Sequence, residues 1–263
     1  MIIIESGFTG ITYPLKNPRI CGFPLTGTVA ASTETAGFGA ALAANQMTYQ
    51  FWRPTAVPAT WEIAFASAQV VSYFGIAAHN LGTKGCTVNF QTWNGSVWVS
   101  HGTHTPTDDS PILFLCARKT VTKARIQITG GSAPDVAVIQ FGDATEFPQK
   151  AAYVGRQDYE QMVQSEYRTV MSDGGHVLGR YYDRKSLGVT LTVETLTEAW
   201  KAAALDPLIV HLKTYAVFVA DRPGVFAKSV AFGQTVKDIV PDRDAPNDQV
   251  AVSVTMEFVC HAA

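Results

Sequence analysis

Two histidines and two aspartates between residues 101 and 109 form the group whose residue types best suit metal chemistry. His101 and His104 are three residues apart, and Asp108 and Asp109 follow shortly after them. Imidazole nitrogens and carboxylate oxygens are ligands that zinc accepts, and carboxylates also suit calcium. The alternative is that THTPTDDSP is a polar loop between two strands, since these residue types are common in turns. The loop is the simpler interpretation, and we expect no resident metal or cofactor.

A second group of side chains suits sugar binding. Trp93, Asn94, Trp98 and His101 surround an Asn-Gly pair that is typical of a β-hairpin turn. Sugar sites commonly combine the faces of aromatic rings with a few fixed polar groups. The alternative is that both tryptophans pack into a core or an interface. These four residues are therefore candidate carbohydrate ligands.

Motifs that mark the common enzyme classes are absent. The sequence contains no GxSxG, no HExxH, no P-loop and no GxGxxG after a strand. The pairs Gly130-Gly131 and Gly174-Gly175 are typical of turns that need a positive φ. We expect a protein that is not an enzyme.

Composition argues against nucleic-acid binding and against a membrane helix. Only 16% of the residues are charged and the formal net charge is −2, which offers no basic surface to a phosphate backbone. No apolar stretch reaches the roughly 20 residues of a membrane-spanning helix. The opening MIIIESGFTG has neither the basic start nor the long apolar run of a signal peptide. We expect no nucleic-acid partner and no membrane insertion.

The share of charged residues is also lower than the quarter or so that is usual. A polar but weakly charged surface suits a protein that neighbouring subunits cover.

The four cysteines are expected to be buried free thiols. Cys21, Cys86, Cys116 and Cys260 are widely spaced and form no CxxC pair, which excludes a zinc ribbon. Cys86 and Cys116 fall within apolar strand patterns, where a reduced cysteine behaves as a small hydrophobic residue. A disulfide is the alternative.

The elements that must position these residues are mostly strands. About seven short β-type runs lie between residues 55 and 147, a pattern typical of an antiparallel β-sandwich. One run ends at the turn-like His79-Asn80, and another meets Asn94-Gly95, which predicts a two-residue hairpin turn. The runs are 61–65, 69–78, 86–93, 96–101, 111–117, 124–130 and 136–142.

Residues 1–54 read differently from the sandwich. They contain one strand-like start and, at 25–47, a stretch of small and almost uncharged residues. This stretch predicts an extended segment that orders against a partner or, alternatively, a flexible linker.

Residues 148–263 predict a second β-rich unit with one principal helix at about 196–213. The Thr195-x-x-Glu198 spacing is that of a capping box. Pro207 predicts an interruption and restart of the helix. A hairpin is expected to turn at Ser172-Asp173-Gly174-Gly175, and strands are expected on both sides of the helix.

Two stretches resemble known families. WEIAF (61–65), SYFGIAAHNLGTKGCTVNFQTWNGSVW (72–98) and ARIQITGG (124–131) together resemble the discoidin, or galactose-binding-like, sandwich found in tail-associated proteins of phages. LGVTLTVETLTEAWKAAALDPLIVHLKTYAVFVADRP (187–223) with QVAVSVTMEFVC (249–260) is similar to the strand–helix–strand unit of phage distal tail and minor tail proteins, which packs into a ring. Here the sandwich precedes the helix-bearing unit, a departure from that family's order.

The resemblance implies a mainly β fold, a galactose-binding-like jelly roll followed by a ring-forming unit. It implies a structural component of a bacteriophage tail tip or baseplate, made in the host cytoplasm and located in the virion. The implied partners are other phage tail proteins and further copies of the chain, as a hexamer or trimer. The alternative function is a glycan-binding module that contributes to adhesion on the host surface. Solvent access of Trp93 and Trp98 distinguishes the two functions.

Overall fold

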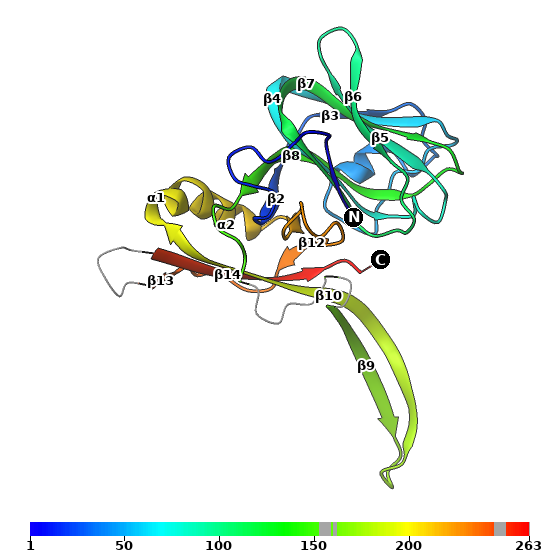
Figure 1. Ribbon diagram of the computed structural model, residues 1–263. Coiled ribbons are helices and arrows are strands. Elements are labelled where there is room, and N and C mark those ends of the chain that lie inside the picture. Colours follow the sequence, from blue (N-terminus) through cyan, green and yellow to red (C-terminus); the bar gives the residue numbers. More distant parts are fainter. Residues whose placement is uncertain (153–158, 160–161, 245–250, 263) are drawn as a thin grey trace.

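Strands make up most of the chain, and one helical segment accompanies them (Figure 1). The computed structural model describes residues 1–152, 159, 162–244 and 251–262. Its strands are β1 (Ile2–Ile4), β2 (Arg19–Pro24), β3 (Thr28–Ala31), β4 (Ala59–His79), β5 (Thr87–Trp93), β6 (Trp98–His104), β7 (Ile112–Thr129), β8 (Val136–Glu146), β9 (Val163–Met171), β10 (Val177–Thr197), β11 (Val217–Ala220), β12 (Val230–Thr235), β13 (Asp242–Asp244) and β14 (Ala251–Cys260).

The strands join in one continuous order, β6-β5-β7-β4-β8-β2-β11-β12-β14-β10-β9, with β1, β3 and β13 attached at its sides. Of the strand pairs in the described residues, β1–β7 is parallel and the others are antiparallel. The prediction of a mainly antiparallel β fold with one helical segment is confirmed.

The long strands β4 and β7 create the sandwich because each passes from one sheet to the other. Their ladder is irregular between Ala64 and Gln69 and again between Val71 and Tyr73. Such bulges let a strand bend without a turn. The sequence predicted two short strands in place of each, and that prediction was wrong because the bent chain stays extended through the crossing.

Aromatic rings fill the space between the two sheets. Trp61, Phe74, Phe90, Phe114 and Phe141 are each at most 2% exposed. Phe90 and Phe114, which come from opposite sheets, stack with ring centroids 4.6 Å apart. Burying one such side chain stabilises the fold by about 1.5–3 kcal/mol, so this cluster supplies much of the sandwich's stability.

The small-residue stretch 25–47 orders against the sandwich of its own chain. β3 pairs with β4, and a short 3₁₀ helix, η1 (Ala40–Ala44), packs on the core. Trp61 Nε1 donates to the carbonyl of Ala40 at 2.9 Å. The expectations of a separate partner or of a flexible linker therefore fail, because these side chains are small enough to lie directly on the sheet.

Residues 1–54 do not stand apart from the rest of the fold. β2 pairs with the sandwich strand β8 on one side and with β11 of the C-terminal unit on the other. The N-terminal segment thus connects the two units.

The principal helix packs on the C-terminal sheet, within the expected range 196–213. It consists of α1 (Glu198–Trp200), a π-helical turn η3 (Lys201–Leu205) and α2 (Asp206–Leu212), which follow one another without a break. The predicted interruption at Pro207 is absent because the π turn just before it, in which Asp206 N–H donates to Lys201 O, carries the helix on.

The helix cap differs from the predicted one. Thr197 Oγ1 accepts a hydrogen bond from Trp200 N–H at 3.2 Å, so Thr197 is the N-cap. Thr195 still lies within β10 and has a φ of +60°, which is incompatible with the capping-box role expected for it.

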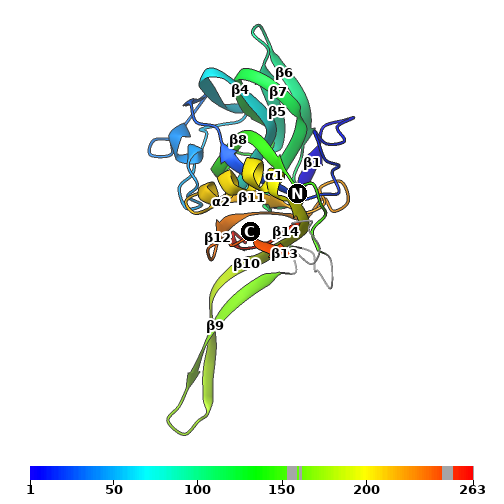
Figure 2. The ribbon, with the colours of Figure 1, turned by 90° about the vertical axis from the view of Figure 1, so that its left-hand side faces the viewer.

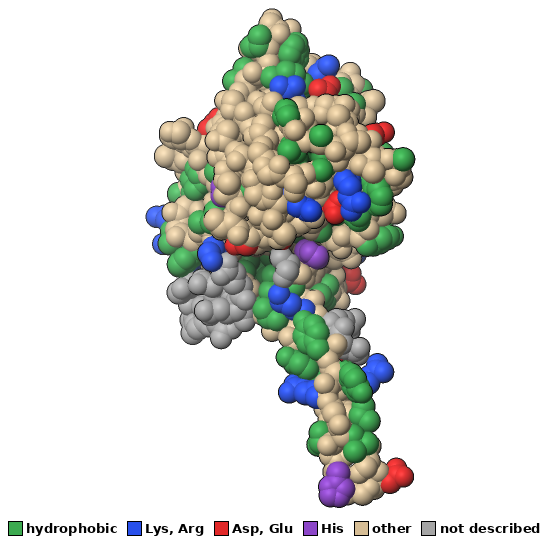
Figure 3. Space-filling view, turned by 90° about the vertical axis from the view of Figure 1, so that its right-hand side faces the viewer, with side chains coloured by type: hydrophobic (Ala, Val, Ile, Leu, Met, Phe, Trp, Pro, Cys, Tyr) green, Lys and Arg blue, Asp and Glu red, His purple; other side chains and the backbone are tan. Residues whose placement is uncertain are grey.

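β9 and the first part of β10 form a hairpin that extends away from the body, and we call residues 163–182 the arm (Figure 2). The arm turns at Ser172–Gly175 as predicted, with Gly175 N–H donating to Ser172 O at 2.9 Å. Every residue of β9 is exposed, and hydrophobic side chains run along the arm's surface (Figure 3).

All four cysteines are buried and unpaired, which confirms the expected free thiols. In the described part of the chain, no helix is long and apolar enough to cross a membrane.

A candidate glycan-binding site at the end of the sandwich

The hairpin of β5 and β6 carries all four candidate carbohydrate ligands. Trp93 and Trp98 form the last pair of its ladder, with ring centroids 5.4 Å apart. The connection runs from Asn94 to Val97 and is wider than the expected two-residue turn. The reason is that Asn94 Oδ1 accepts hydrogen bonds from the N–H groups of Ser96 and Val97, at 3.0 and 2.9 Å.

His101 points inward because it occupies a bulge in β6. Phe90 pairs with Gly102 and Gln91 pairs with Ser100, so His101 has no partner in the ladder. A bulged residue breaks the alternation of a strand and redirects its side chain. The His101 side chain is only 9% exposed.

A pocket of about 560 Å³ opens at this end of the sandwich. Trp93, Asn94 and His101, three of the four predicted residues, line it. The other lining residues are Ala68, Thr92, Gly95, Val99, Lys119, Thr120, Val121 and Thr122. The walls are the hairpin and the crossing parts of β4 and β7, so the pocket depends on the bend in those two strands.

A hydrogen-bonded row lies along this pocket. Glu5 Oε1 is 3.1 Å from His101 Nδ1, and His101 Nε2 is 2.7 Å from Thr92 Oγ1. Lys119 Nζ pairs with the same carboxylate at 2.9 Å. The row fixes the orientation of each polar group, and groups that are already ordered lose less entropy when a ligand binds.

The charges in this row follow from burial and from neighbouring groups. Burial lowers the pKa of His101 below 6.5, Lys119 lowers it further, and Glu5 offsets only part of the effect. Burial by itself would raise the pKa of Glu5, but hydrogen bonds from Lys119 and from Ala117 N–H bring it below its usual value. At neutral pH a neutral imidazole therefore donates from Nδ1 to a carboxylate and accepts from the Thr92 hydroxyl at Nε2.

The order carboxylate, imidazole, hydroxyl is also one that can activate a nucleophile. Here the hydroxyl belongs to Thr92, which is 3% exposed. Most glycoside hydrolases use two carboxylates for catalysis. The residues that line this pocket include no aspartate and no glutamate.

Trp98 is not among the residues that line the pocket, although its ring packs against that of Trp93 on the same face of the hairpin. The guanidinium of Arg125 sits 4.1 Å from the centre of a Trp98 ring. Arg125 Nε donates to Gln91 Oε1 at 2.6 Å, and Gln91 Nε2 donates to Gln127 Oε1 at 3.2 Å. We call Trp98, Arg125, Gln91 and Gln127 the outer strip.

The two candidate metal-binding histidines are held by different surroundings. His101 belongs to the row with Glu5 and Thr92. His104 ends β6 opposite Val88, and burial lowers its pKa. The two histidines are therefore close in sequence, but their side chains do not meet at one position where both could bind a metal ion.

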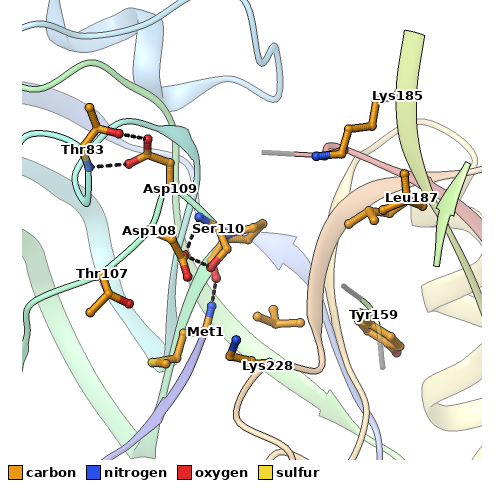
Figure 4. A pocket seen from close by; sticks show the side chains of 14 residues that line it. Met1, Thr83, Thr107, Asp108, Asp109, Ser110, Tyr159, Lys185, Leu187 and Lys228 are labelled. Carbon is orange, nitrogen blue, oxygen red and sulfur yellow. Dashed lines mark hydrogen bonds between the residues drawn. The ribbon is translucent and has the colours of Figure 1, made fainter. Parts of the chain in front are cut away.

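The two candidate aspartates brace the loop that follows (Figure 4). Asp109 accepts from the N–H and the hydroxyl of Thr83 at 3.0 and 2.6 Å, and Asp108 accepts from Ser110 N–H at 2.9 Å. Both line a second pocket, of about 520 Å³, between this loop and the C-terminal unit. Among the residues that the structure describes, no group of three or more His, Cys, Asp or Glu is placed to hold a metal ion. The geometry favours the loop interpretation.

Glu5, Lys119 and Arg125 were not anticipated from the sequence. Glu5 lies 96 residues from His101, and no local pattern could link the two. One weak indication of the position of Arg125 was present in the sequence. This residue alternates with apolar residues, so its side chain had to face outward from its strand.

Similarity to known proteins is found among solved structures. No protein-family model and no curated protein matches the chain. Among solved structures, a pectin-binding carbohydrate-binding module is similar at 12% identity, with a TM-score of 0.40, covering 46% of this chain and 93% of the module.

Two further modules show the same extent of similarity. Chitosan-binding module 1 of a chitosanase/glucanase from Paenibacillus sp. IK-5 has 17% identity and a TM-score of 0.39, covering 46% of this chain and 97% of its own. The family 32 carbohydrate-binding module of C. perfringens NanJ, solved with galactose, has 14% identity and a TM-score of 0.40. The match covers 45% of this chain and 93% of the module. What these modules bind is a property of those proteins.

Proposed function

We propose that the sandwich is a glycan-binding module. One observation carries the proposal, namely a pocket that places the half-buried Trp93 beside polar groups already fixed by hydrogen bonds. Sugar rings offer apolar C–H faces to an aromatic ring and hydroxyls to fixed polar partners, and this pocket provides both. Lys119 and Asn94 add donors to its rim.

The proposal is for binding without catalysis. The buried Thr92 hydroxyl is part of the row that orients His101, so its role here is positional. The polar row and the aromatic ring act together to recognise a saccharide, and its covalent bonds stay unchanged.

Replacing Trp93 with alanine is expected to weaken glycan binding by about tenfold to hundredfold, the usual effect of removing a central aromatic contact. The ligand is first identified by applying the purified protein to a glycan array, and its affinity is then measured by calorimetry. Tyr49→Ala is the matched control, because Tyr49 is an aromatic residue that is 73% exposed and does not line the pocket. An array without any bound saccharide, or a Trp93→Ala variant with unchanged affinity, would contradict the proposal.

A second candidate function is that of a subunit in a larger assembly, and the arm favours it. A two-stranded hairpin is marginally stable by itself in water, and this one exposes large apolar side chains. Val177, Leu178 and Tyr181 are between 64% and 67% exposed. We propose that other copies of the chain cover the arm in a closed trimer or hexamer, as expected for a virion tail-tip component that also contacts other phage tail proteins.

Changing Leu178 and Tyr181 together to aspartate is expected to convert the assembly into monomers, because the charges would have to be buried in the interface. Light scattering after size-exclusion chromatography measures the mass of each form. Glycan binding should stay unchanged in this variant, since the arm and the β5–β6 hairpin, whose residues line the pocket, lie at opposite ends of the molecule (Figure 2). Wild-type protein that stays monomeric at high concentration would exclude assembly through copies of this chain.

A further inference from the structure

The outer strip presents an arginine that is held in place and makes no direct ion pair with a described residue. Arg125 is fixed from two sides, by the ring of Trp98 and by the hydrogen bond from its Nε to Gln91. Gln91 is itself buried and bonded to Gln127, so the support is rigid. Within residues 1–152, 159, 162–244 and 251–262, no carboxylate lies within ion-pair distance of Arg125.

The neighbouring cations of β7 differ from Arg125 in this respect. Arg118 pairs with Asp143, Lys119 with Glu5 and Lys123 with Glu62 at 2.8, 2.9 and 3.8 Å. Arg125 and Glu62 sense each other's charge, yet the Glu62 carboxylate lies nearest to Lys123 among these cations.

The acidic residue beside Arg125 is Glu62 of β4, which lies opposite it in the ladder. β5, β6 and β7 contain no aspartate and no glutamate. An anion that approaches Arg125 from the side of β5 and β6 therefore meets positive charge and aromatic rings, since Glu62 lies on the opposite, β4 side of β7.

The geometry of a guanidinium favours a particular kind of anion. Its planar fork donates two parallel hydrogen bonds to a carboxylate, and stacking on an aromatic ring keeps the fork oriented. The Nε edge is already used by Gln91, which leaves the two terminal NH₂ groups directed to a ligand. Trp98, which stacks on Arg125, also forms the ladder pair with Trp93 at the pocket.

We propose that Arg125 binds the carboxylate of an acidic saccharide, so that the glycan recognised by this module contains uronic acid. This inference rests on the proposed glycan-binding function and names its ligand class. The sugar ring occupies the pocket beside Trp93. The carboxylate of this sugar, or the carboxylate of the next sugar along the glycan, reaches over the hairpin to Arg125.

The test compares an oligogalacturonate with its fully methyl-esterified form on the wild-type protein and on three variants. Esterification removes the negative charge and keeps the sugar, so the ratio of the two affinities reports the carboxylate contact alone. Wild-type protein is expected to prefer the acid by about tenfold or more, the usual effect of a charge-assisted hydrogen-bond pair. The preference should shrink as salt is raised, because the site is open to solvent.

Arg125→Ala is expected to abolish the preference while retaining the weaker binding of the ester. Arg125→Lys keeps the charge but loses the fork and the stacking, and it should recover only part of the preference. Arg243→Ala is the matched control, since Arg243 pairs with Glu198 in the C-terminal unit and its loss should change neither affinity. Circular dichroism checks that each variant is folded.

The outcomes separate this inference from the proposed function. Equal affinity of wild-type protein for acid and ester, or an Arg125→Ala variant that keeps the preference, overturns the inference and leaves glycan binding in place. The inference is also overturned if the protein binds a sulfated saccharide on the glycan array and binds no uronic acid. The anion recognised by Arg125 would then be a sulfate. Failure of every saccharide on that array to bind overturns both.

Discussion

Replacing Glu146 with alanine is expected to destabilise the folded protein by about 3–5 kcal/mol, because it leaves a buried cation without its counter-ion. Arg19 Nη2 lies 2.9 Å from Glu146 Oε1, and the two side chains are only 2% and 6% exposed. Burial lowers the pKa of Arg19, and the nearby charge of Glu146 opposes that effect. Without the carboxylate, the guanidinium keeps the cost of burial and loses its main compensation.

Glu146 also supports the chain just before β2. Its two oxygens accept hydrogen bonds from the backbone N–H groups of Ile11, Thr12 and Tyr13, at 3.0, 2.7 and 2.8 Å. A buried backbone donor that loses its acceptor destabilises the fold further. Since Glu146 ends β8 and Arg19 begins β2, the pair fixes the place where the sandwich meets the N-terminal segment.

Urea denaturation of the wild-type protein and of three variants tests this prediction. Glu146→Gln, which keeps one acceptor oxygen, is expected to fall between the wild type and Glu146→Ala. The double variant Arg19→Met with Glu146→Ala should recover part of the loss, because no unpaired charge remains buried. A Glu146→Ala variant within about 1 kcal/mol of the wild type, the range of ordinary surface changes, would refute the role assigned to the pair.

Acidification from about pH 7 to about pH 4 is expected to lower the free energy of unfolding by about 3 kcal/mol through His79 alone. Burial lowers the pKa of His79 from 6.5 to about 4, and Asp109 and Ser110 offset only part of this effect. The neutral ring fits its surroundings. Its Nε2 is 3.0 Å from the carbonyl of Ser110, and its Nδ1 accepts from Leu81 N–H at 3.2 Å. A proton added at Nδ1 would face that N–H group.

The direction of the effect follows from proton binding. In the unfolded chain His79 titrates near its ordinary value, so between about pH 4 and 6.5 the unfolded state binds more protons than the folded state. Stability therefore rises with pH across this window. The contribution is fully present above about pH 6.5 and is lost as the pH falls to about 4. Burial also lowers the pKa of His101, His104, His211 and His261, and these shifts act in the same direction.

Unfolding by urea at a series of pH values measures this slope. His79→Gln is expected to be less stable at neutral pH but to lose less stability on acidification. His176→Gln is the matched control, because His176 is exposed at the tip of the arm and its removal should leave the slope unchanged. A His79→Gln variant with the slope of the wild type would show that another group is responsible.

The local features of the chain were determined by the sequence itself. Alternating apolar residues predicted the strands of the sandwich and of the C-terminal unit, and the Asn94-Gly95 pair predicted the hairpin that carries Trp93 and Trp98. The hairpin at Ser172–Gly175 and the helix near 196–213 were likewise evident. Each of these depends on residues close together in the chain, where turn propensity, capping and alternation act.

Tertiary structure alone decided which of these features combine. The bulges that bend β4 and β7 opened the pocket, and the bulge at His101 turned its ring toward Glu5. The sequence also placed a turn between strands that remain continuous, since a bulge and a turn interrupt alternation alike. The link to phage tail proteins stays a prediction.

The contacts of Glu5 with His101, of Arg125 with Trp98 and of Arg19 with Glu146 join residues from different strands. Each depends on the register of a sheet or on the bending of a strand, which long-range packing sets. The sequence therefore determined the elements and the face of Trp93 and Trp98, and the assembled sheet determined the pocket, its polar row and the outer strip.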